Sequence, residues 1–469
     1  MNYIKMGLRL SISLYVLLHF ISYFYEHKML LSSMAVTGLL IFLFSICLKK
    51  MSQFKIPLTL VVTGLIILMS SNSSIINGFY EGMLLMRNII GLLVIIPFIG
   101  WVLNTEPYIE SVMSFAYKMI NTSRKFYFAI SSFTQVIAFF LLFGSIPMMY
   151  DFVNKMVGNQ HGEPLENFKG TALLRSFALS TIWVVTIPSF IFAVETLKSS
   201  LWLSILQGML ISISGILIAV LFSYFEEKKY GVNLTEIISM EMKQVMAKSS
   251  VVNGNGNVKG FFLLFLTLFG SIFLVHAIWP IELMLQVPFV IIIWTIFYFL
   301  WKKRVGRLAT EAKQYFTNKI EHQSYQLSMM LGAGMMIYSI NQTGFGGYVV
   351  SSVNFMQEHF PSINLLYFLP FIVILLGFVG LGPLTVMVLV AGILKNIALP
   401  YPPELIVLSI TSGSVISIML SPVIMPVIVL SAANGLSGLK NGVRFNWKFA
   451  IVFYLFVQVY IQVMLLFWS

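Results

Sequence analysis

The chain has 469 residues, of which 58% are hydrophobic and 10% are charged, and its mean hydropathy is +0.90. This composition leaves too little polar surface for a water-soluble globule and excludes that class. The formal net charge of +12 does not indicate nucleic acid, because the basic residues stand in short blocks between apolar spans. The single cysteine, Cys47, excludes an intrachain disulfide and a thiolate metal cluster.

The chain begins with a basic start and an apolar core, in MNYIKMGLRLSISLYVLLHFISYFY. A signal peptide has the same pattern. However, no small-residue cleavage site follows, and the apolar stretch leads directly into a second one. We therefore expect an additional first membrane helix within residues 1–28.

Apolar stretches of membrane-crossing length recur along the rest of the chain. A crossing needs about 20 such residues. We therefore predict an all-α polytopic membrane protein with about 11 transmembrane helices. They are Gly7–Tyr25, Met29–Leu48, Ile56–Met69, Met83–Leu103, Gly170–Val194, Leu201–Phe225, Gly260–Trp279, Met284–Trp301, Tyr325–Ile340, Glu404–Ala432 and Phe445–Trp468.

Two further apolar segments are interrupted by a Gly-x-x-Pro sequence, from Gly144 to Pro147 in the first and from Gly380 to Pro383 in the second. Glycine loses the most backbone entropy in a helix and proline removes a backbone donor, so both interruptions favour a turn. We predict re-entrant hairpins at residues 126–165 and 365–398. Such backbone is tolerated in a bilayer only where protein or water satisfies its polar groups.

A second pair of matching sequences follows the predicted hairpins. LSTIWVVTIPSF begins at Leu179, and GSVISIMLSPVI begins at Gly413. In each, a hydroxyl-rich stretch stands eight residues before a proline, which pairs Ser180 with Ser414. We expect a broken helix at both places. Two matched interruptions at membrane depth predict a transporter whose substrate site lies between its repeats.

The basic residues predict the orientation. Lysine and arginine gather on one side of the predicted crossings and are absent from residues 70–82, 280–283 and 341–364 on the other side. The positive-inside rule then puts the N-terminus in the cytoplasm and the C-terminus outside. Residues 29–225 and 260–469 each contain an odd number of predicted crossings. We therefore expect two inverted repeats, joined by a cytoplasmic linker at residues 226–259.

This layout resembles the ion transporter superfamily, most closely its divalent anion:sodium symporter branch, over nearly the whole chain. The resemblance implies that hairpin tips and broken helices hold substrate and coupling cations, and that a transport domain slides as an elevator against a dimeric scaffold. The symporters' Ser-Asn-Thr signature is absent from both tips. The implied binding residues are Gly144, Ser145, Pro147, Ser180, Thr181, Gly380, Gly382, Pro383, Thr385, Thr411, Ser412, Gly413 and Ser414.

Two interpretations of the hydroxyl-rich stretches stay open. A broken helix exposes backbone N–H groups at one half-helix and carbonyls at the other, and hydroxyls add further oxygens, which suits ligand binding. Alternatively, small residues at such places allow close helix packing and bond back to the preceding turn.

Charged residues within the spans are candidate functional groups because burying them is costly. Arg175 is a candidate partner for an anionic substrate or for the first hairpin tip; the alternative is a side chain that reaches the inner headgroups. Asp151 is a candidate cation ligand or proton carrier, or else a cap on the second arm of the hairpin. Glu195 is expected at the outer boundary.

These features predict a secondary active transporter that moves a small, anionic organic solute across the cytoplasmic membrane, coupled to sodium or protons. We expect a homodimer in the lipid bilayer, without enzymatic activity, nucleic-acid partner, metal site or cofactor beyond the coupling cation. The alternative is a membrane protein that handles lipid-linked or polymeric envelope substrates, as a flippase or polymerase does. The basic inner face would attract the phosphate headgroups of such substrates.

Overall fold

The computed structural model describes residues 2–71, 73–108, 111–112, 122–157, 162–236, 238, 255–279, 281–360 and 363–468. Over these residues every regular element is helical, and nine helical stretches are long and apolar enough to cross a membrane. The predicted class, an all-helical polytopic membrane protein, is confirmed. The number of crossings and the depth of the hairpins stay predictions. Much of the predicted linker 226–259 lies outside the described residues.

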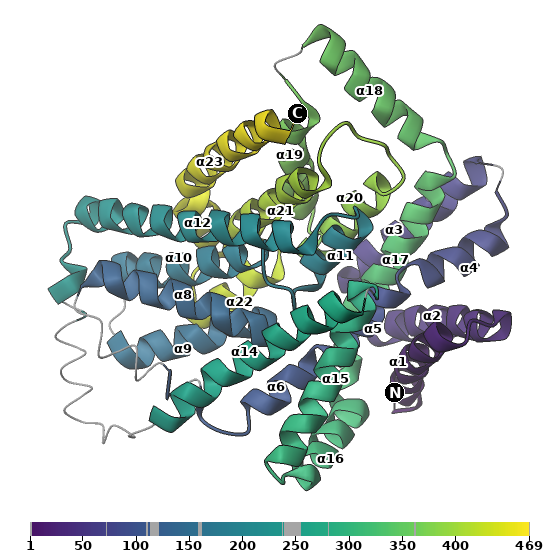
Figure 1. The fold of residues 1–469 in the computed structure, drawn as a ribbon, viewed down its shortest axis with the longest axis horizontal. Helices are drawn as coiled ribbons and strands as arrows, with labels where there is room; N and C mark the ends of the chain where they lie inside the picture. The colour runs from purple at the N-terminus through teal and green to yellow at the C-terminus, as the bar shows by residue number, and fades with distance from the viewer. Residues whose placement is uncertain are drawn as a thin grey trace.

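One group of helices comes mainly from the N-terminal part of the chain (Figure 1). It consists of α1 (Asn2–Phe24), α2 (Lys28–Leu48), α3 (Met51–Ser70), α4 (Ile75–Leu85) and α17 (Ser324–Asn341). The last of these, α17, packs against α2, α3 and α4, so a helix from the C-terminal half completes this group. The predicted crossing at Met83–Leu103 is interrupted in the structure. It is divided among α4, α5 (Arg87–Ile95) and α6 (Pro97–Leu103).

A second group begins with two helices that fold back on each other, followed by a broken helix. The elements are α8 (Ser123–Leu141), the short turn η1 (Leu142–Gly144), α9 (Ser145–Val157), α10 (Glu163–Ser180), α11 (Pro188–Thr196) and α12 (Leu201–Tyr230). Helices α8, α10 and α12 contact one another and lie side by side in Figure 1. The chain between α10 and α11 is not helical, as predicted for Ser180 and Thr181.

The same order of elements occurs again near the C-terminus. It comprises α19 (Leu365–Phe378), α20 (Pro383–Leu394), α21 (Pro403–Leu420), α22 (Met425–Asn434), the short π-helix η4 (Lys440–Arg444) and α23 (Phe445–Trp468). Contacts of α21 with α19 and α23 repeat those of α10 with α8 and α12. The chain is therefore built twice from a helix pair, a broken helix and a long final helix.

The predicted position of the second break is wrong. Helix α21 runs without interruption through Thr411, Ser412, Gly413 and Ser414, and the helix ends only at Leu420. Close packing is the physical reason for a small-residue sequence inside this helix. A Cβ atom added at Gly413 would lie 2.6 Å from the carbonyl oxygen of Pro370 on α19. The TSGS sequence therefore permits a close helix crossing, the packing interpretation given above.

The remaining elements connect or flank these groups. They are α14 (Asn255–Ile278), α15 (Leu283–Trp301), α16 (Val305–Gln314), the short turns η2 (Tyr315–Lys319) and η3 (Ile320–Gln323), and α18 (Phe345–His359). Helix α15 packs against α5, α6 and α14. Helix α18 projects from the rest of the molecule in Figure 1.

The two copies exchange contacts at their breaks. Helix α11, the second half of the first broken helix, packs against α20 of the second copy. Helix α22, the second half of the second broken helix, packs against α9 of the first copy. The interrupted segments of both copies consequently meet in one region.

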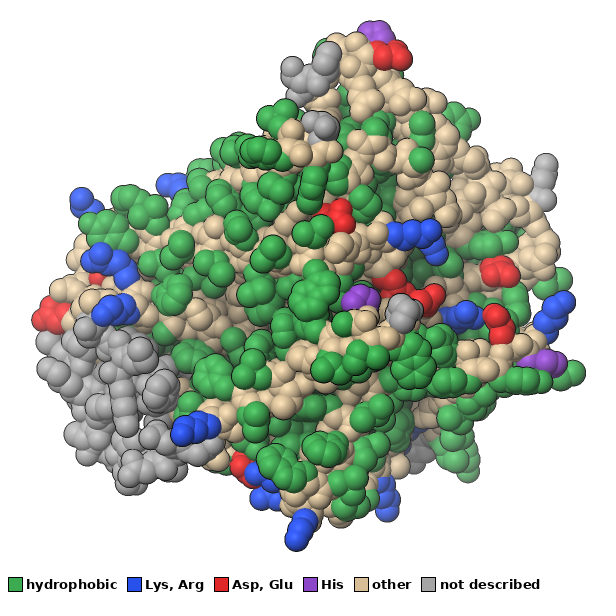
Figure 2. All heavy atoms as spheres, viewed as in Figure 1, with side chains coloured by type: hydrophobic (Ala, Val, Ile, Leu, Met, Phe, Trp, Pro, Cys, Tyr) green, Lys and Arg blue, Asp and Glu red, His purple; other side chains and the backbone are tan. Residues whose placement is uncertain are grey.

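The outer surface of the helices is strongly apolar. Leu206, Leu217 and Leu221 on α12 are each more than half exposed, as are Leu266 on α14 and Leu375 on α19. Figure 2 shows hydrophobic side chains spread over the face formed by α12, α14 and α23, with most lysine and arginine side chains toward its edges. Removing one such leucine from water is worth about 2 kcal/mol, so this surface fits lipid rather than water.

Replacing Gly413 with alanine should destabilise the protein, because its Cβ atom would meet the backbone of α19 at Pro370. Overpacking of this kind costs about 1–3 kcal/mol. Gly270→Ala on α14 is the matched control, since nothing lies within 4 Å of its added Cβ atom. Thermal unfolding of the detergent-solubilised variants measures the difference. Equal melting temperatures for the two variants would contradict the close packing of α19 and α21.

Candidate functional site

The tip of the first helix pair is formed by Leu142, Phe143 and Gly144. Leu142 has φ 49° and ψ −126°, so the helix cannot continue through it. The hydroxyl of Ser145 donates to the carbonyl oxygen of Leu142 at 2.7 Å and fixes the start of α9. Gly144 is exposed and Ser145 is buried, and Pro147 lies in the first turn of α9. The interruption is therefore where the sequence predicts it.

The tip of the second pair depends on glycine. Gly380 has φ 100°, in a region that residues with a Cβ atom rarely adopt. Gly382 precedes α20 as its N-cap, and Pro383 is the first residue of that helix, where a missing N–H costs nothing. Thr385 is buried in the first turn of α20. This interruption also lies where the sequence predicts it.

Each broken helix is held to the neighbouring helix pair by one hydroxyl. The Thr186 hydroxyl, from the first break, donates to the carbonyl oxygen of Phe139 near the end of α8. The Ser421 hydroxyl, from the second break, donates to the carbonyl oxygen of Gly377 near the end of α19 at 2.9 Å. The sequence analysis missed both residues. Their common signal is a hydroxyl one or two positions before a proline, Pro188 or Pro422.

The predicted hydroxyls bond mainly within their own helices. Those of Ser180, Thr181, Thr411 and Ser412 each donate to a carbonyl oxygen three or four residues earlier. Such bonds satisfy the hydroxyl locally and leave the oxygen less free for a ligand. Ser414 differs, because its hydroxyl is buried without a hydrogen-bond partner.

A cavity lies where the two copies meet. It contains about 620 Å³ of empty space, including its open mouth, and its wall includes Leu142 and Phe143 of the first tip, Thr181 of the first break, and Pro383 and Leu384 at the start of α20. Of the predicted site residues, Thr181 and Pro383 are thus brought together. The other predicted residues are not among the lining residues: Gly144, Ser145, Pro147, Ser180, Gly380, Gly382, Thr385, Thr411, Ser412, Gly413, Ser414, Arg175 and Asp151.

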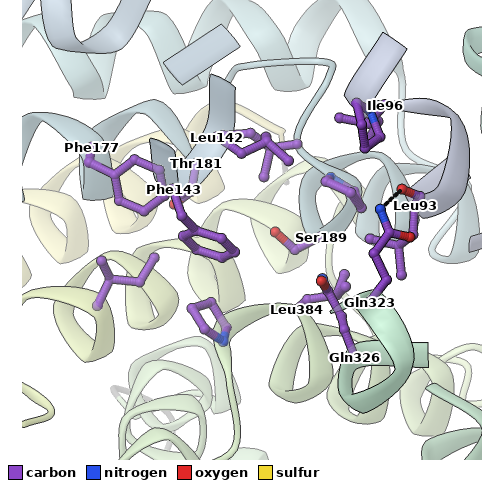
Figure 3. A pocket seen from close by; sticks show the side chains of 15 residues that line it. Leu93, Ile96, Leu142, Phe143, Phe177, Thr181, Ser189, Gln323, Gln326 and Leu384 are labelled. Carbon is purple, nitrogen blue, oxygen red and sulfur yellow. Dashed lines mark hydrogen bonds between the residues drawn. The ribbon is translucent and has the colours of Figure 1, made fainter. Parts of the chain in front are cut away.

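The far wall of the cavity comes from the other helix group. Leu93 and Ile96 of the α5–α6 region, with Gln323 and Gln326 at the start of α17, form it. Figure 3 shows Phe143 and Phe177 on one side of the space, the two glutamines on the opposite side, and Ser189 between them. The cavity therefore separates the broken-helix group from the α5 and α17 group.

The cavity wall contains polar groups but no charged side chains. None of its lining residues is ionisable, and most are aliphatic or aromatic. The first turns of α11 and α20 reach it through Ser189 and Leu384. The first backbone N–H groups of a helix have no acceptor within the helix and carry partial positive charge. The N-termini of α11 and α20 thus offer the cavity partial positive charge at two points of its wall.

One amide on the wall is fixed in orientation. The Gln323 Nε2 group donates to the carbonyl oxygen of Leu93 at 3.2 Å and to the hydroxyl of Tyr315 at 3.1 Å. The Tyr315 hydroxyl in turn donates to the carbonyl oxygen of Val94 at 2.8 Å. The Oε1 atom of Gln323 is left without a partner. The glutamine is therefore a pre-oriented acceptor next to the cavity.

Arg175 is neither a headgroup ligand nor a cavity residue. Its side chain is fully buried, where Nε donates to Asn446 Oδ1 at 2.9 Å and Nη2 to the carbonyl oxygen of Phe445 at 2.9 Å. The guanidinium also pairs with Glu226 at 3.5 Å and lies 4.7 Å from the centre of the Phe449 ring. This arginine ties α10 to α12 and α23, so the interpretation that it reaches the inner headgroups is wrong.

A second buried charged group, which the sequence analysis did not identify, joins α9 to α10. Lys169 is 1% exposed and donates through Nζ to Asn154 Oδ1 at 2.7 Å. It also pairs with Glu166, which accepts from the Tyr150 hydroxyl at 2.8 Å. Asp151, in contrast, is exposed in the middle of α9 and does not cap that helix. The second arm of the first pair is thus fixed to the first broken helix.

Arg175→Lys should destabilise the protein by about 2 kcal/mol or more, because lysine cannot reproduce the forked contacts and each unpaired buried acceptor costs about 1–3 kcal/mol. Arg124→Lys is the matched control, since Arg124 is exposed and should change stability by about 0.5 kcal/mol or less. Thermal unfolding in detergent compares the two variants. Indistinguishable melting temperatures would show that the Arg175 contacts do not stabilise the fold.

Comparison with known proteins supplies no relative. The chain matches no protein-family model and no curated protein sequence.

Proposed function

We propose that the chain is a secondary active transporter that moves a small organic anion across the cytoplasmic membrane. The observation that carries this proposal is the cavity lined by a helix-pair tip, a broken helix and the start of α20. Interrupted helices of this kind are the places where transporters bind solutes at membrane depth. At an interruption, backbone N–H and C=O groups can face a solute, whereas in an unbroken helix they bond to each other.

The duplicated architecture supports alternating access. Each copy contains a helix pair, a broken helix and a long final helix in the same order. The exchanged contacts, α11 with α20 and α9 with α22, support the prediction that the copies are inverted repeats. Two related copies with opposite orientation can occupy two equivalent arrangements around one site, which is the basis of alternating access.

Two groups of helices fit the moving and fixed parts of an elevator. The first tip, α10, α11, α20 and α21 supply one wall of the cavity, and the α5–α6 region and the start of α17 supply the other. The buried Lys169 contacts join α9 to α10 within the first group, and the Arg175 contacts join α10 to α12 and α23. Because the boundary between the two groups passes through the cavity, one group can slide past the other while the solute stays bound to the moving group. The resemblance to the divalent anion:sodium symporters supports the same arrangement, including a homodimeric scaffold.

An anionic solute with an apolar part fits the lining. The N-termini of α11 and α20 favour negative charge, while Phe143, Phe177 and Leu384 offer apolar contact. A gradient supplies about 2.3 kcal/mol per charge for each 100 mV, so one or two coupling ions suffice for concentrative uptake.

One observation favours the alternative function, handling of lipid-linked substrates. An apolar groove with about 930 Å³ of empty space runs between α18 and the second helix pair, and Val349, Leu369 and Ile393 are among its lining residues. A hydrocarbon chain fits such a surface. The groove lacks the polar groups of the central cavity, so we place it second.

Ser189→Trp should abolish transport by filling the cavity, while the protein stays folded because Ser189 faces empty space. Ser351→Trp on α18 is the control, since that residue is exposed and far from the cavity lining. Proteoliposomes with an imposed sodium or pH gradient are tested for uptake of radiolabelled succinate, citrate and lactate. We expect uptake to fall at least about tenfold in Ser189→Trp and not in Ser351→Trp.

The same vesicles distinguish the alternative. Gradient-independent scrambling of a fluorescent phospholipid, without uptake of any of the anions, would replace the transporter proposal with lipid translocation. Full uptake by the folded Ser189→Trp variant would show that the cavity is not the binding site of the solute.

A further inference from the structure

The short helix α11 has a polar residue in its first turn and an acidic residue in its last. Ser189 lines the cavity, and Glu195 lies six residues later, about 9 Å along the axis at 1.5 Å per residue. This nine-residue helix therefore connects the cavity wall at one end to Glu195 at the other.

Glu195 caps a helix outside the broken-helix group. Its Oε2 atom accepts a hydrogen bond from the backbone N–H of Met284 at 2.7 Å, and the N–H of Leu283 also donates to the carboxylate. These are the first N–H groups of α15, whose own N-cap residue, Glu282, makes no side-chain cap bond. A carboxylate at a helix N-terminus is stabilised by the helix dipole. Glu195 thus connects α11 to α15 across the boundary between the two groups.

The charged residues around Glu195 come from several elements. Glu282 at the start of α15 repels it, and Lys395 at the end of α20 attracts it. On the α5 side, Asn88 donates to Glu282 at 2.8 Å. On α21, Glu404 accepts the N–H of Ser200 at 2.8 Å, and the charged residues of α12 begin only at Glu226.

Arg87 is the charged residue at the start of α5, and Lys198 precedes α12. Figure 2 shows acidic, basic and histidine side chains together on this face, where α14 ends and α15 begins. Glu195 is thus the carboxylate of this cluster that contacts both groups of helices.

Partial burial favours the protonated form of this carboxyl. Glu195 lies directly after the predicted crossing, which ends at Val194. Removal of the carboxylate from water raises its pKa to about 7, against the lowering effect of the Met284 hydrogen bond. The carboxylate form is favoured above that pH and the neutral form below it. A change of one pH unit around neutrality therefore alters the charge state substantially.

We propose that Glu195 is the proton-binding residue that couples the movement of α11 to a proton gradient. The inference rests on the proposed transport function. One proton from the side predicted to be outer binds the carboxylate, which becomes a neutral carboxylic acid. The hydrogen bonds to α15 then lose their charge-assisted part, and α11 is released from the scaffold. The proton returns to solution when α11 reaches its other position.

A substrate-independent measurement tests proton binding directly. Infrared titration of the purified protein in nanodiscs follows the C=O stretch of protonated carboxyl groups between pH 5 and 9. A band with its midpoint within about one unit of pH 7 should disappear in Glu195→Gln, which keeps an acceptor for the Met284 N–H. The matched control Glu404→Gln, another carboxyl bonded to a backbone N–H, should retain it. Persistence of the full band in Glu195→Gln would overturn the inference.

Transport separates this inference from the proposed function. With one unit of pH gradient, a single coupled proton supports about tenfold accumulation. Proteoliposomes with wild-type protein should reach that level for at least one of succinate, citrate and lactate, and Glu195→Gln should only equilibrate it. Equal proton-driven accumulation by wild type and Glu195→Gln would reject Glu195 as the coupling residue and leave the transporter intact. Absence of uptake by wild type, with the infrared band assigned to Glu195, would reject the transport function and not the proton site.

Discussion

Interrupted backbone in an apolar interior is the constraint on which the architecture depends. Every break exposes N–H and C=O groups that lipid cannot satisfy, and this chain meets the requirement twice in the same manner. A hydroxyl from each break, Thr186 or Ser421, donates to a carbonyl near the end of the adjacent helix pair. Glycine supports the arrangement where backbones must approach, as at Gly413 against Pro370. Each of these hydroxyls satisfies a carbonyl group near the end of a neighbouring helix, where the helix itself supplies no donor.

The interrupted segments of the two copies form part of the cavity wall. Each second half-helix packs on the helix pair of the opposite copy, so the broken helix of each copy is in contact with the other copy. Their interrupted segments converge, and the first turns of α11 and α20 point partial positive charge at the same space. The α5 and α17 group closes that space from the other side with the fixed amide of Gln323. The cavity therefore lies on a boundary between two packed bodies, where relative movement alters it most.

Buried charges stabilise one side of this boundary. Arg175 and the Lys169 group have partners within the broken-helix assembly, and a buried charge is tolerated when its hydrogen bonds are complete. Glu195 instead bonds across the boundary to α15. Internal ion pairs join helices within the assembly, whereas in the proposed coupling the Glu195 contact at its edge makes its attachment to α15 dependent on protonation. The buried contacts within the assembly and the Glu195 contact across the boundary therefore have different roles in the proposed coupling.

The sequence alone determined the membrane class, the duplicated order of elements and both Gly-x-x-Pro tips, because apolar run length and the backbone demands of glycine and proline are local properties. It also located the first break at Ser180. It misplaced the second break, since the small residues around Gly413 suit close packing as well as interruption, and only the approach of α19 decides between them. The sequence could not assign Arg175, Lys169 or Glu195. Whether a charge near a span meets lipid, solvent or a buried partner depends on helices distant in the chain, and only the tertiary structure brings those helices together.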